Sequence, residues 1–147
     1  MTAALQLSKK NETSMTGEQR LHQMLIATAR ELGFSKKQSE EAAEAGTMRV
    51  EGVKITVTCL ETDTQKDAIV VAQLAVPIAG DTIRQLLEIN LIAAIAMRST
   101  IAIDCDGAAI LLALVPIKEA TPISFAHHIG QMAMFANTLE CQLSRSA

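Results

Sequence analysis

The stretch TMRVEGVKITVTCLETDTQKDAIVVAQLAV, residues 47–76, decides the fold because strand patterns and turn signals follow one another closely in it. Residues 47–51 are a short strand candidate, and Glu51-Gly52 suits a tight hairpin turn because glycine tolerates positive φ. Residues 61–67 form a polar turn, and residues 68–76 are apolar at almost every position, so an antiparallel strand there needs cover on both faces. Between these segments, apolar residues alternate with polar ones, as is typical of a half-buried strand: Val53, Ile55, Val57 and Cys59.

Residues 16–19, TGEQ, predict the start of a first helix through a capping box, in which Thr16 caps amide groups and Gln19 reaches back. Apolar residues then recur at helical spacing as far as Leu32, and Gly33 predicts a left-handed end. Residues 35–46 are charged and rich in alanine, which leaves open a short helix or a loop. Residues 1–16 are polar and lack sustained periodicity, so we expect a disordered arm there.

Two further helices are expected on the C-terminal side. Asp81 or Thr82 caps a second helix, whose apolar stripe is wider than one packing face needs: Ile83, Leu86, Leu87, Asn90, Leu91 and Ala94, beside Ile92 and Ile95. Two strands follow, residues 100–104 and 109–115, joined through Asp106-Gly107. The last helix begins at Pro122 after a Thr121 cap, and its apolar residues step by four and three: Phe125, Ile129, Met132, Ala136, Leu139 and Leu143.

The order helix, three strands, helix, two strands, helix predicts an α+β fold with an antiparallel sheet. A chain of 147 residues fits one domain, and we expect residues 17–147 to form it. The mean hydropathy is +0.24, with 49% hydrophobic residues and 20% charged residues. This modest apolar excess suggests that a second subunit or a bound partner covers part of the surface.

Charge and composition argue against several classes of function. The net charge is −3, and the chain has no Trp, no Tyr and no cluster of Lys and Arg, which argues against nucleic-acid binding. The three cysteines are far apart, and His127 and His128 point about 100° apart on a helix, so we predict no metal and no cofactor. No catalytic constellation is recognisable, so we predict no enzyme.

Targeting signals are also missing from the pattern. The first ten residues lack the apolar core of a signal peptide. The longest apolar run, residues 108–117, is too short to span a bilayer as a helix. We therefore predict a cytoplasmic protein that does not insert into a membrane.

Residues 86–91, LLEINL, resemble the Leu-Leu-x-x-Asn-Leu stretch in the second helix of the Tir chaperone (CesT-like) family, class I, of type III secretion systems. The strand pair after it and the long last helix continue the resemblance, and residues 21–34 are similar to the opening helix of the family. The resemblance covers residues 18–143. The chain departs from the family pattern in its longer, more charged 35–46 segment and in the missing large aromatic residue near its end.

The resemblance implies a homodimeric chaperone of the bacterial cytoplasm that keeps an extended N-terminal segment of a secreted effector soluble and competent for secretion. The secretion ATPase or other export machinery would be a further partner. For effector binding we select residues of the first helix and first three strands: Leu25, Val50, Ile55, Val57, Ile69 and Val71. For the dimer interface we select residues of the second helix and the strand after it: Leu87, Asn90, Leu91, Ile95, Ile101 and Ile103.

Two questions stay open at this point. Asn90 either caps or cross-links backbone at the interface or is an ordinary polar residue beside the core. The alternative function is a small-molecule-binding or regulatory α+β dimer, which would need convergent polar groups in an apolar cavity.

Overall fold

The computed structural model describes residues 16–75 and 80–145, which contain one five-stranded sheet with four helices. The sheet is antiparallel, in the order β1-β2-β3-β5-β4. The strands are β1 (Thr47–Val50), β2 (Val53–Glu61), β3 (Lys66–Gln73), β4 (Ser99–Ile103) and β5 (Ala109–Pro116). The helices are α2 (Gly17–Glu31), α3 (Lys36–Ala45), α4 (Gly80–Met97) and α5 (Pro122–Arg145).

This architecture confirms the predicted α+β fold and element order. It also settles the choice at residues 35–46 in favour of a helix, α3, which begins with a capping box of Ser35 and Gln38. The predicted arm, residues 1–16, lies outside the described residues except for Thr16. Pro77, expected to end the third strand, lies outside them too.

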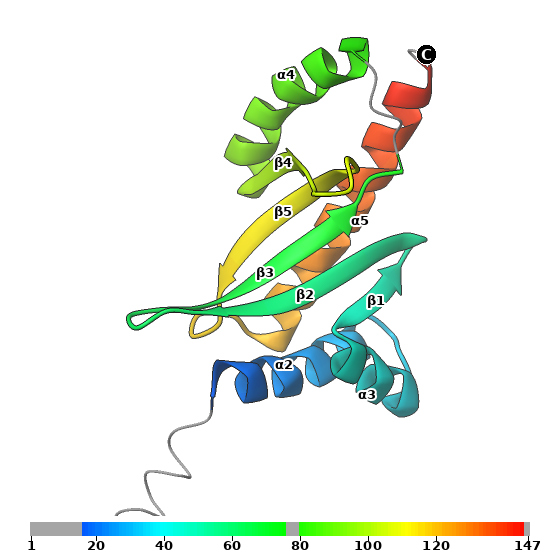
Figure 1. The fold of residues 1–147 in the computed structure, drawn as a ribbon. Helices are drawn as coiled ribbons and strands as arrows, with labels where there is room; N and C mark the ends of the chain where they lie inside the picture. Colours follow the sequence, from blue (N-terminus) through cyan, green and yellow to red (C-terminus); the bar gives the residue numbers. More distant parts are fainter. Residues whose placement is uncertain (1–15, 76–79, 146–147) are drawn as a thin grey trace, which may run out of the picture.

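The helices α2 and α5 pack on the same face of the sheet, so the core lies between them and the strands. Figure 1 shows α5 behind the strands, α2 and α3 below β1 and β2, and α4 beside β4 at the other end. Ile55 of β2 and Ile129 and Met132 of α5 have no exposed surface. The alternation predicted for β2 is confirmed, because its odd-numbered residues from Val53 to Val57 are buried.

Local signals position the ends of these elements. Gln19 N donates to Thr16 Oγ1 at 3.2 Å and Thr16 N donates to Gln19 Oε1 at 3.1 Å, which confirms the capping box. At the end of α2, Gly33 has a φ of +93°, and Phe34 N donates to the Ala29 carbonyl at 3.0 Å. Thr121 caps α5, because its Oγ1 accepts from Ser124 N at 3.1 Å.

The predicted start of α4 is wrong by two or three residues, because a cap at Asp81 or Thr82 would make residue 82 or 83 the first of the helix. The helix begins at Gly80, so Asp81 and Thr82 lie inside its first turn. A carboxylate in the first turn complements the helix dipole as a cap does, which is why the sequence alone does not separate the two positions.

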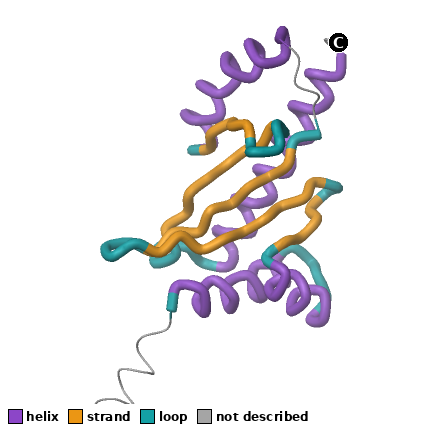
Figure 2. The backbone as a smooth tube through the Cα atoms, viewed as in Figure 1, coloured by secondary structure: helices purple, strands orange, loops and turns teal. Residues whose placement is uncertain are grey.

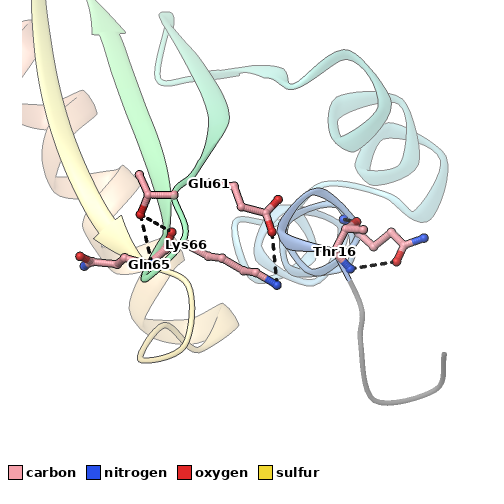
Figure 3. Close-up of polar contacts among 6 residues, drawn as sticks. Thr16, Glu61, Gln65 and Lys66 are labelled. Carbon is pink, nitrogen blue, oxygen red and sulfur yellow. Dashed lines mark hydrogen bonds and ion pairs between the residues drawn. The ribbon is translucent and has the colours of Figure 1, made fainter. Parts of the chain in front are cut away.

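Short turns connect the first three strands (Figure 2). Glu51 and Gly52 both have positive φ, 50° and 81°, and form the two-residue turn between β1 and β2. Asn137 of α5 donates to the Glu51 carbonyl at 3.1 Å and so ties this turn to the helix layer. At the next turn, Lys66 pairs with Glu61 at 3.4 Å beside the first turn of α2 (Figure 3).

Candidate protein-binding surfaces

One face of the sheet carries apolar residues that no helix of the described chain covers (Figure 1). The strand register places Ile69 between Thr58 and Leu114, and Val71 between Thr56 and Leu112. These six residues are here called the open face: Thr56, Thr58, Ile69, Val71, Leu112 and Leu114. Ile69 and Val71 are half-buried and Leu114 is 53% exposed. Threonines therefore flank an apolar strip on β3 and β5, and an exposed apolar strip of this kind marks an interaction surface.

The structure divides the six residues selected for effector binding between two environments. Ile69 and Val71 lie on the open face, where another chain can reach them. The other four are part of the core between the sheet and the helices, with exposures of 8% or less: Leu25, Val50, Ile55 and Val57.

Sequence reasoning missed Leu112 and Leu114. Both occur in the apolar run of β5, which has no polar alternation to distinguish one face from the other. The pairing of β5 with β3 brings them beside Val71 and Ile69. That pairing joins strands distant in sequence, so the local pattern did not contain it.

A second apolar surface lies on α4 and β4. In this helix Leu86 and Ala93 are buried, at 4% and 0% exposure. The residues of the α4 surface point away from the core and are exposed by 52–76%: Leu87, Leu91, Ile92, Ile95 and, on β4, Ile103. A small apolar cavity of about 50 Å³ lies between this helix and β4, and its lining residues include Leu87 and Ile103.

Asn90 holds α4 against β4. Its Oδ1 accepts a hydrogen bond from Ile101 N at 2.8 Å, and both residues are half-buried. Asp104 N donates to the Ala108 carbonyl, so the even-numbered amides of β4 face β5 and the odd-numbered ones face the free edge. Asn90 thus cross-links backbone within one subunit and occupies an edge amide of the sheet.

Titratable groups give no sign of a metal or reactive centre in residues 16–75 and 80–145. No group of three His, Cys, Asp or Glu there could hold a metal ion. Burial raises the pKa of the Cys59 thiol, and the nearby Glu61 and Glu18 carboxylates raise it further, so the thiol stays protonated. No helix among these residues is both long and apolar enough to cross a membrane.

Comparison with solved structures finds the same fold in chaperones of type III secretion. The Yersinia pestis chaperone SycH, solved with a stable fragment of YscM2, has a TM-score of 0.59 at 14% identity, over 81% of this chain and 98% of that chain. The HopA1–SchA chaperone–effector complex gives a TM-score of 0.65 at 11% identity, over 86% of this chain and 98% of that chain. The heterodimeric ExoU–SpcU complex from the type III secretion system of Pseudomonas aeruginosa gives a TM-score of 0.53 at 19% identity, over 67% of this chain and 83% of that chain.

At these identities the structures show the fold alone, and comparison with curated proteins found no match. The family comparison is decisive, because the model of the Tir chaperone protein (CesT) family matches residues 23–140. The chain belongs to the Tir chaperone protein (CesT) family. The resemblance carried by residues 86–91 and the element order is thereby confirmed.

Proposed function

We propose that this chain is a type III secretion chaperone that binds an extended N-terminal segment of a secreted effector and keeps it soluble and competent for secretion. The observation that carries the proposal is the open face, where Ile69, Val71 and Leu114 form an apolar strip with no cover from the described chain. SchA was solved with the effector HopA1 as a chaperone–effector complex, which supports this class of partner. The proposal includes no catalytic step and no cofactor, and it places the protein in the bacterial cytoplasm.

The open face suits an extended chain better than a folded partner domain. Residues two apart in an extended segment point to the same side, as Ile69 and Val71 do on β3. Burial of apolar surface contributes about 25 cal/mol per Å², from which the cost of ordering the segment is subtracted. Main-chain pairing adds affinity and register where a sheet edge is free. The sheet order makes β1 an edge strand, whereas Asn90 occupies part of the β4 edge.

We further propose that two copies pair through the α4 surface. Leu91 and Ile95 are 66% and 76% exposed although they belong to a regular helix of 18 residues. A row of exposed leucine and isoleucine side chains costs solvation free energy in a lone subunit, and pairing of the same surface on two copies removes it from water. The predicted interface residues Leu87, Asn90 and Ile103 adjoin this row.

Effector binding is tested by co-expression with the N-terminal region of the protein encoded by the adjacent reading frame. We expect the complex to protect one segment of that region from protease. Leu114→Asp places a charge on the open face and should weaken binding at least tenfold, because the charge loses water when the segment binds. The matched control is Met134→Asp, since Met134 is 62% exposed on α5. A segment that is equally labile with and without the chaperone would refute the proposal.

A further inference from the structure

A cavity of about 220 Å³ lies at the end of β5, between the residue that follows α4 and the first two turns of α5. Leu114, Val115 and Phe125 are among its apolar lining residues, and Arg98, Glu119 and His128 are among its polar ones. Leu114 also belongs to the open face, so the cavity adjoins that strip at this residue. A cavity of about 150 Å³ is enough for a benzene ring, so this one has room for one large apolar side chain.

Two polar side chains of this cavity lack a partner in the described chain. His128 Nε2 is buried and makes no hydrogen bond. The Arg98 guanidinium makes no ion pair or hydrogen bond with residues 16–75 or 80–145. Ser124, by contrast, is satisfied, because its Oγ donates to the Thr121 carbonyl at 3.1 Å. Arg98 is exposed, so its guanidinium is accessible to an acidic group of a ligand, whereas His128 Nε2 lies inside the wall of the cavity.

The backbone at Arg98 is left-handed. Its φ is +49°, a conformation that glycine adopts more readily than other residues. The chain nevertheless has an arginine there. Arg98 directly follows Met97, the last residue of α4, so this conformation belongs to the end of the helix and holds the arginine at the mouth of the cavity.

We infer that this cavity receives one large apolar side chain of the effector segment, while a carboxylate next to that side chain in the segment pairs with Arg98. This inference rests on the proposed chaperone function, because the segment reaches the cavity across the open face. Glu119 lines the same cavity and repels a carboxylate, so it moderates the affinity.

The test is a selection from a phage-displayed library of random 12-residue peptides on the purified, full-length protein. The peptides retained should carry Asp or Glu within two positions of Phe, Leu or Met more often than the unselected library does. Selection on Arg98→Gly should lose that acidic preference. This variant should fold normally, because glycine relaxes the strained φ while it removes the guanidinium.

Affinities of one selected peptide, measured by fluorescence anisotropy, sharpen the result. We expect Arg98→Gly to weaken binding about fivefold and Glu119→Gln to strengthen it about twofold. Arg20→Ala is the matched control, because Arg20 is an exposed arginine on α2 that does not line the cavity. It should leave the affinity unchanged.

The possible failures separate the two proposals. Peptides that bind without an acidic preference, or equally well to Arg98→Gly, would overturn the cavity inference and leave the chaperone function standing. Tighter binding of wild type than of Glu119→Gln would also overturn it, because the ligand would then not be acidic. If no peptide binds, both proposals fail.

Discussion

The long helices α4 and α5 are both apolar, but they use their apolar side chains in opposite ways. In α5, Phe125, Ile129 and Leu139 are at most 2% exposed, because the stripe packs on the sheet and α2. In α4, Leu91 and Ile95 are 66% and 76% exposed. The comparison teaches that helical periodicity predicts an apolar face but not what covers it. The α5 stripe is covered by its own subunit, and for the α4 surface we propose a second copy.

The largest expected effect comes from the α5 stripe. Ile129→Ala removes a side chain with no exposed surface and should lower the free energy of unfolding by about 2–5 kcal/mol through lost burial and a residual cavity. Urea unfolding followed by circular dichroism measures the change. Ile123→Ala is the control, because Ile123 is 68% exposed on the same helix and should change stability by less than about 0.5 kcal/mol. Equal losses of unfolding free energy in the two variants would show that the α5 stripe does not stabilise the core.

A substitution on the α4 surface should weaken the association of two copies rather than the folding of each copy. Leu91→Glu is expected to weaken self-association about 100-fold, because each copy of a symmetric interface loses a buried leucine worth about 1.5 kcal/mol or more. Light scattering at micromolar concentration measures this, with Met134→Glu on α5 as the control. The far-ultraviolet circular dichroism should not change. A wild-type protein that is a stable monomer at these concentrations would refute the proposed dimer.

The same contrast explains how far sequence reasoning reached. The capping box at Thr16, the Glu51-Gly52 turn and the α5 stripe depend on neighbours a few residues away, so local patterns predicted them correctly. The side of the sheet that the helices cover depends on contacts between distant segments. An alternating strand such as β2 does not reveal this side. Ile55 and Val57 were therefore selected for a groove although they lie in the core, and Leu114 was missed.

A smaller effect is expected from the polar contact that holds α4 on the sheet. Asn90→Ala leaves the half-buried Ile101 amide without its acceptor at 2.8 Å, which should cost about 1–2 kcal/mol of unfolding free energy. Exchange of the Ile101 amide hydrogen should also become faster. Asn137→Ala is the control, because its hydrogen bond to Glu51 is exposed and water can replace it. Unchanged exchange at Ile101 would show that Asn90 does not secure this edge.

The smallest expected effect is a pH dependence that arises in α5. Burial lowers the pKa of His128 below its ordinary value of 6.5, and the neighbouring His127 lowers it further. In the unfolded chain the imidazole takes up a proton near pH 6.5, whereas the folded chain keeps it neutral to lower pH. As the pH falls below 6.5, the unfolded state thus binds more protons than the folded state. The folded chain therefore loses stability from about pH 6.5 down to the lower pKa that His128 has in the folded state.

Unfolding free energies measured in urea between about pH 7.5 and pH 5 test this sign. We expect wild type to lose stability as the pH falls through this range, because the lowered pKa of His128 makes the unfolded state the better proton acceptor. His128→Gln should flatten this part of the profile, while His127→Gln, at an exposed position of the same turn, should largely preserve it. Arg98 and Glu119 line the same cavity, so the comparison is made with both residues intact. If His128→Gln keeps the full slope, another group causes the pH dependence.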